Sequence, residues 1–171
     1  CMLHLTNPRG KLAASWRDLR YMLKPSNWQA EDMAEERESR AKSLKHHLYL
    51  LYAQARADQV CRDAMPIIAD EIERFDYDEV TVYSYWMSVP ARAALLIRSK
   101  LAETKPTYTL RSFARGHGYD IYDEASRVGY QPFRRALIQR MDALYPCSTY
   151  GVRYMEARYM RPGEERKIYL A

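Results

Sequence analysis

Glycine is absent from a long stretch of the chain, Lys11 to Arg115, and this absence most constrains the possible folds. Tight β-hairpin turns and β-bulges usually need glycine, which adopts positive φ angles without steric cost. Prolines interrupt the stretch at four positions, Pro25, Pro66, Pro90 and Pro106. The sequence therefore favours helices joined by short turns.

The 171 residues are enough for one domain with a hydrophobic core, because 47% of them are hydrophobic. No apolar run is long enough to span a bilayer. We expect an N-terminal extension with helices (1–43), a domain of helical hairpins (44–146) and a C-terminal helix with a tail (147–171).

Apolar residues recur at helical spacing along most of the chain. This spacing predicts a helix at residues 11–23, a charged helix or linker at 28–42, and a helix that begins near Leu44. Further predicted helices lie near residues 60–75, 78–87, 90–104, 107–115, 120–129, 132–144 and 150–159. The prediction is an all-α fold, a short α-solenoid of about seven to nine helices arranged as antiparallel hairpins.

Residues 75–87 leave an alternative open, because several of them are β-branched and suit a strand. We favour a helix there. Asp78 would be its N-cap, and Val80, Tyr83 and Met87 would share one face.

The helical pattern of residues 48–75 begins again after about one repeat length. Tyr49 and Tyr83 lie 34 residues apart, and each is followed by apolar residues at helical spacing. Helix pairs at this period form α-solenoids, because one pair alone cannot bury its apolar face.

This window resembles a pentatricopeptide repeat, a helix pair whose first helix opens near a Thr-Tyr or Val-Thr-Tyr stretch. The matching residues are Tyr52, Ala53, Ala55, Gln59, Val60, Ala64, Ile67, Ile68, Ile72, Asp78, Glu79, Val80, Thr81 and Tyr83. The resemblance covers roughly residues 44–144, and it departs from the family's pattern at Pro66 and in the short unit from Pro106 to Pro132. Unrelated helical hairpins of unequal length are the alternative.

The resemblance extends to small pentatricopeptide-like accessory subunits of the euglenozoan mitochondrial F1-ATPase. It implies a non-catalytic subunit of the mitochondrial F1Fo ATP synthase, bound to the outside of the F1 α subunit. The C-terminal segment alternates Tyr, Met and Arg, which are enriched at interface hot spots. The expected partner-binding residues are Tyr150, Arg153, Tyr154, Arg158, Tyr159 and Met160. A last helix that only caps the solenoid is the alternative.

An RNA-binding pentatricopeptide-type protein or a mitoribosome component is the second hypothesis, since repeat proteins of this kind read single-stranded RNA. Four aromatic residues with two arginines alongside would form stacking platforms: Tyr83, Trp86, Tyr108, Phe113, Arg111 and Arg115. About three irregular repeats are few for such recognition. We therefore expect these aromatic residues to fill the seam between helices, and we expect no nucleic-acid partner.

The sequence predicts no enzymatic activity, no cofactor and no metal. It contains no nucleophile elbow, phosphate-binding loop or dinucleotide fingerprint. His46 and His47 would point about 100° apart on a helix, so they would not chelate one metal as i, i+4 residues do. Helix capping explains the acidic residues Asp76, Asp78 and Glu79.

The first residues indicate mitochondrial import. Arg9, Lys11 and Arg17 precede the first acidic residue, Asp18, and basic, acid-poor leaders are typical of imported proteins. We expect a location on the matrix side of the inner membrane after cleavage of a leader; a trimmed sequence is the alternative. Three cysteines without Cys-x-x-Cys spacing fit a reducing compartment.

Overall fold

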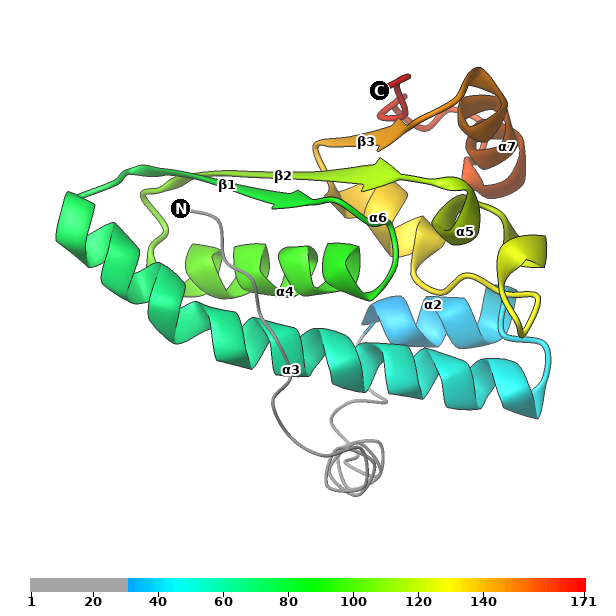
Figure 1. Cartoon of the computed structure of the whole chain (residues 1–171), viewed down its shortest axis with the longest axis horizontal. Helices are drawn as coiled ribbons and strands as arrows, with labels where there is room; N and C mark the ends of the chain where they lie inside the picture. The colour runs from blue at the N-terminus through cyan, green and yellow to red at the C-terminus, as the bar shows by residue number, and fades with distance from the viewer. Residues whose placement is uncertain (1–30) are drawn as a thin grey trace.

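The computed structural model describes residues 31–171 and shows a mixed α/β fold (Figure 1). Its helices are α2 (Glu31–Ser39), α3 (Leu44–Phe75), α4 (Val89–Thr104), α5 (Gly118–Ile121), η2 (Asp123–Ala125), α6 (Arg134–Arg140) and α7 (Thr149–Tyr159). Its strands are β1 (Glu79–Ser84), β2 (Thr109–Gly116) and β3 (Ala143–Pro146). The prediction of an all-α solenoid with seven to nine helices is therefore wrong. The predicted helix at 11–23 and the basic leader residues lie outside the described part.

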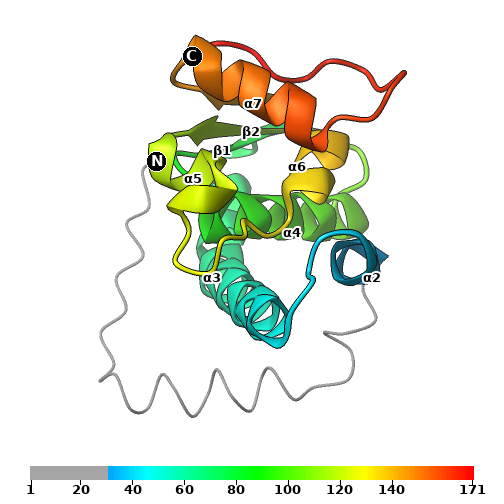
Figure 2. The same cartoon turned by 90° about the vertical axis from the view of Figure 1, so that its right-hand side faces the viewer.

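The three strands form one parallel sheet in the order β1-β2-β3. Each new strand is added on the same side of the previous one. Right-handed crossovers, which parallel strands use almost always, then place the connecting helices on the same face of the sheet. In Figures 1 and 2, α4 lies beneath β1 and β2, and α3 lies beneath α4 on the same side of the sheet.

Two segments predicted as helices, 78–87 and 107–115, instead form most or all of the strands β1 and β2. Both have a period of two: in β1, Val80 and Val82 are half-buried, whereas Thr81 and Tyr83 are exposed. A lack of glycine does not exclude parallel strands, because crossovers that contain a helix join such strands and need no tight glycine turn. The strand alternative for residues 75–87 is the correct one.

The predicted hairpin of residues 48–75 is instead a single helix, α3. Ser43 caps its N-terminus by accepting a hydrogen bond from the His46 N–H at 3.3 Å, and Asp76 ends it in the left-handed conformation with φ 53°. Helix-forming residues continue through Asp58, and the exposed Pro66 lies inside the helix without ending it. The hairpin on which the pentatricopeptide resemblance rests is therefore not present in the structure.

Other helix predictions are confirmed or shortened. α4 begins next to Pro90 and ends before Lys105, and α7 covers the predicted 150–159 segment. The helix predicted near 120–129 is reduced to α5 and η2. The helix predicted at 132–144 stops at Arg140, and β3 follows it.

Two clusters of buried apolar side chains fill the space between the sheet and its helices. The larger includes Met33, Leu50, Leu137, Leu144 and Met155, and thus joins α2, α3, α6, α7 and β3. The smaller includes Cys61, Ala64, Ile72, Ile97 and Leu101, and joins α3 to α4. The larger cluster contains residues from all three predicted segments, 1–43, 44–146 and 147–171. Within residues 31–171, no helix combines the length and apolarity needed to cross a membrane.

Gly116, the last residue of β2, packs closely against neighbouring side chains. A Cβ atom there would come within 2.9 Å of both Ile121 Cγ1 and Met87 Sδ. We expect Gly116→Ala to lower the free energy of unfolding by about 1–3 kcal/mol, because buried neighbours must move. Gly118→Ala is the control in urea unfolding, since its Cβ would meet only a Tyr122 ring carbon at 3.8 Å. Equal stability losses in the two variants would contradict this packing.

Candidate nucleic-acid interface

One face of the sheet is left uncovered by the helices of residues 31–171. Side chains alternate between the two faces of a strand. One set points toward α3 and α4, and the other points away from them. We call the second set the open face; it consists of Glu79, Thr81, Tyr83, Thr109, Arg111, Phe113, Arg115, Ala143 and Tyr145, with Tyr169 of the tail beside it. An open face is unusual for a parallel sheet, because such sheets normally have helices on both sides.

Aromatic rings cross the open face from strand to strand. Tyr83 and Phe113 are neighbours in the β1–β2 register, and the Phe113 and Tyr145 ring centroids lie 6.2 Å apart. The Tyr145 and Tyr169 centroids are also 6.2 Å apart. Tyr83 is 54% exposed and Tyr169 is 44% exposed, so the row is accessible at both ends.

The C-terminal tail holds Tyr169 in this row. Ile168 forms a parallel bridge with Leu144 of β3, and the Tyr169 N–H donates to the Leu144 carbonyl at 2.9 Å. The Ala171 N–H then donates to the Pro146 carbonyl at 3.0 Å. The tail thus extends the sheet beyond β3 and brings a fourth ring to the open face.

Arginines flank the aromatic row. The half-exposed Arg111 lies 3.5 Å from Glu79, a separation at which a surface ion pair contributes little. The guanidinium of Arg115 lies 5.9 Å from the Tyr85 ring centroid, within cation–π range. Its Nε atom is buried and has no hydrogen-bond partner within the described residues.

A second group of rings adjoins the carboxyl ends of β1 and β2. The His117 ring centroid lies 4.8 Å from that of Tyr85 and 4.7 Å from that of Trp86. Four residues named from the sequence as a stacking platform lie on the open face, and a fifth, Trp86, lies in this second group of rings; the four are Tyr83, Arg111, Phe113 and Arg115. The sixth, Tyr108, instead packs against the apolar cluster of α3 and α4.

The open face has the chemistry of a stacking surface. Its side chains on β1, β2 and β3 include no aliphatic group larger than alanine. Exposed rings offer π faces to nucleobases, and each base stacked on an aromatic ring contributes about 1–3 kcal/mol. Arginine adds both stacking and attraction for phosphate.

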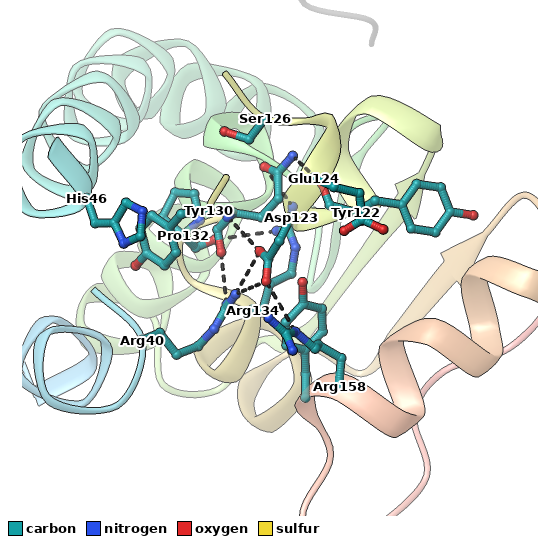
Figure 3. Close-up of polar contacts among 12 residues, drawn as sticks. Arg40, His46, Tyr122, Asp123, Glu124, Ser126, Tyr130, Pro132, Arg134 and Arg158 are labelled. Atoms are coloured by element: carbon teal, nitrogen blue, oxygen red, sulfur yellow. Dashed lines mark hydrogen bonds and ion pairs between the residues drawn. The ribbon is translucent and has the colours of Figure 1, made fainter. Parts of the chain in front are cut away.

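A different polar cluster centres on Asp123 (Figure 3). Its carboxylate accepts two hydrogen bonds from the Arg40 guanidinium, at 2.9 and 3.0 Å, and one from the Gln131 backbone N–H at 2.8 Å. Arg158 lies 3.4 Å away. These contacts tie α2 and α7 to the loop before α6, so the cluster stabilises the fold.

A buried acidic group lies next to this cluster. Glu36 is fully buried and accepts a short hydrogen bond from the Tyr130 hydroxyl. Burial raises the pKa of Glu36, although Arg40, 3.8 Å away, and the Tyr130 hydroxyl both act to lower it. Arg134 is also fully buried, donates to the backbone carbonyls of Met87 and Asp120, and has its pKa lowered by burial.

The raised pKa of Glu36 predicts a pH-dependent stability. In the folded protein Glu36 keeps its proton at pH values where the unfolded chain, near pKa 4.5, has lost it. The resulting stability is present below pH 4.5 and is lost as the pH rises through the folded-state pKa.

Glu36→Gln stays neutral, so we expect its stability advantage over the wild type to grow with pH, by no more than about 1.4 kcal/mol per pH unit. Urea unfolding at a series of pH values measures this difference, with the exposed Glu38→Gln as the matched control. A stability difference between Glu36→Gln and the wild type that does not change with pH would contradict the assignment.

Of the six residues predicted to bind a partner, five are at least partly exposed and one, Tyr159, is buried. Tyr150 and Arg153 are exposed on α7, whereas Tyr159 is buried beneath the Arg40 guanidinium, 4.4 Å from its ring centroid. Tyr154 donates to Glu124 and accepts from the Asp123 N–H. Arg158 belongs to the Asp123 cluster, and Met160 is half-buried.

Other parts of the described structure offer fewer side chains that could bind a ligand or a metal. A groove of about 340 Å³ at the carboxyl ends of the strands includes Trp86 and Asp120, but both Asp120 oxygens accept backbone N–H groups. The described strand order has no reversal, which is where open α/β sheets usually bind ligands. His46 contacts the Val128 carbonyl, and His47 contacts that of Ser43. Residues 31–171 contain no group of three His, Cys, Asp or Glu side chains placed for a metal.

No family model, curated protein or solved structure matches the chain. Its function must therefore be inferred from its own geometry.

Proposed function

We propose that the protein binds single-stranded nucleic acid on the open face of its sheet. The observation that carries the proposal is the row of rings at Tyr83, Phe113, Tyr145 and Tyr169, with Arg111 and Arg115 alongside. Bases would stack on the rings, and the arginines would contact phosphates. The proposal assigns no chemical step to the protein.

The open face offers rings and arginines to bases and phosphates, whereas the aliphatic side chains of β1 and β2 point toward α3 and α4. The net charge of +5 favours a polyanion. The accessory-subunit hypothesis was argued from helical hairpins, and the described fold offers no such hairpin repeat to support it.

Fluorescence anisotropy with labelled oligo(U) RNA and oligo(dT) DNA tests the proposal. We expect saturable binding of single strands of about ten nucleotides. The affinity should fall as salt is raised from about 50 to 200 mM, because phosphate contacts release counterions. A blunt RNA duplex is the control, since its bases are already stacked and are not available to the rings.

Absence of single-strand binding at about 50 mM salt would overturn the proposal. So would equal affinity for the duplex, because it would indicate attraction by charge alone.

A further inference from the structure

We infer that the free edge of β1 pairs with the same edge of a second copy of this chain. In this dimer the two β1 strands run antiparallel, and two three-stranded sheets join into one. The inference concerns the edge of the sheet and stands independently of the proposed function of its open face.

Within residues 31–171, no strand pairs with the outer edge of β1. Thr109 N–H donates to the Asp78 carbonyl at 2.9 Å, so the even-numbered residues of β1 face β2. The N–H and C=O groups of Glu79, Thr81 and Tyr83 therefore lie in the plane of the sheet and point away from β2. Such a row of groups is a template for another strand.

The usual protections of an edge strand are missing from β1. Its sequence, EVTVYS, contains no lysine, proline or glycine, and it has no bulge in its pairing with β2. Val80, Thr81 and Val82 are β-branched and suit a central strand. An edge of this kind favours pairing with another strand over exposure to solvent.

The edge is complementary to itself in one antiparallel register. With Thr81 opposite Thr81 of the other copy, Glu79 lies opposite Tyr83, and Val80 lies opposite Val82. All the outward backbone groups then meet as hydrogen-bonded pairs. Each valine meets a valine on the covered side of the sheet, and no like charges face each other.

Exposed apolar side chains lie at both ends of this edge. Phe75 and Tyr77, with ring centroids 5.6 Å apart, are both about half exposed just before β1. Tyr85 is 54% exposed just after it. The same register brings Tyr77 of one copy opposite Tyr85 of the other. A groove of about 310 Å³ along the edge, lined by Ile68, Ile72 and Val80 among others, is further surface that the second copy would cover.

A two-fold axis through Thr81, perpendicular to the sheet, keeps both open faces on the same side. The aromatic rows of the two copies would then form one continuous surface. This consequence rests on the proposed function, whereas the dimer itself does not.

Disulfide trapping tests the dimer. Directly opposed residues of a hydrogen-bonded antiparallel pair have Cα atoms about 5.5 Å apart, which suits a disulfide. In a background without Cys1 and Cys147, we expect Thr81→Cys to form a covalent dimer under mild oxidation. Thr109→Cys is the matched control, because it lies on the same face but one strand further in.

Sedimentation velocity provides the second measurement. The wild type should sediment as a dimer, and Thr81→Lys should sediment as a folded monomer, because two ammonium groups would meet at the axis. Thr109→Lys should remain a dimer. A wild-type monomer, a dimeric Thr81→Lys, or equal trapping of the two cysteine variants would each overturn the inference. RNA binding is measured on the wild-type protein and the dimer is measured without RNA, so failure of the dimer and failure of the open face can be distinguished.

Discussion

Replacing Phe113 and Tyr145 together with alanine is expected to weaken binding of oligo(U) RNA by about 30-fold or more, since each stacked base contributes about 1–3 kcal/mol. The two rings lie side by side on neighbouring strands, 6.2 Å apart, at the centre of the open face. Both are only partly buried, and on the face away from the helices, so the fold should tolerate their loss. Anisotropy titrations at fixed salt measure the affinity, and circular dichroism checks the fold.

The matched control is a double replacement of exposed tyrosines away from the open face, Tyr52→Ala with Tyr119→Ala. Tyr52 lies on α3 and Tyr119 lies in α5, and both are well exposed. We expect the control to bind within about twofold of the wild type, because surface substitutions away from a site change little. Equal losses in the two double variants would contradict stacking on the open face.

Asp123→Asn is expected to lower the free energy of unfolding by about 3–5 kcal/mol, since removal of one partner leaves a buried charge uncompensated. The Arg40 and Asp123 side chains are only 13% and 10% exposed, and their bidentate contact holds α2 against the loop before α6. The variant keeps the size of the side chain and removes its charge. Urea unfolding monitored by tryptophan fluorescence measures the loss.

Glu79→Gln is the control for this prediction. Its ion pair with Arg111 spans 3.5 Å, and both side chains are more than half exposed. We expect a change below about 1 kcal/mol, as for other surface pairs. If Asp123→Asn is no more destabilising than Glu79→Gln, the Asp123 cluster does not hold the fold together.

The sequence could predict the helices whose ends carry clear local signals. Pro90 marks the start of α4, and Lys105-Pro106 follows its end. For α7, apolar residues at helical spacing mark the helix. The sequence could not distinguish the strands from helices. In β1 the apolar residues fit both patterns: Val80, Tyr83 and Met87 match a helical period, and Val80 and Val82 match a period of two. The missing glycines excluded hairpins and left parallel strands possible.

The candidate site was predicted only in part. Arg111, Phe113 and Arg115 alternate along one strand, so their shared face follows once β2 is recognised. The addition of Tyr145 and Tyr169 depends on how β3 and the tail join the sheet, and no local pattern encodes that. The Asp123 cluster was missed for the same reason, because Arg40 and Asp123 lie 83 residues apart in the chain.

The most direct test of the central claim is photocrosslinking of the wild-type protein to oligo(U) RNA that carries 4-thiouridine, with the modified residues mapped by mass spectrometry. The proposed function predicts adducts on the open face, at Tyr83, Phe113, Tyr145 or Tyr169. Adducts confined to the Asp123 cluster, or no adducts under conditions where the RNA is bound, would contradict it.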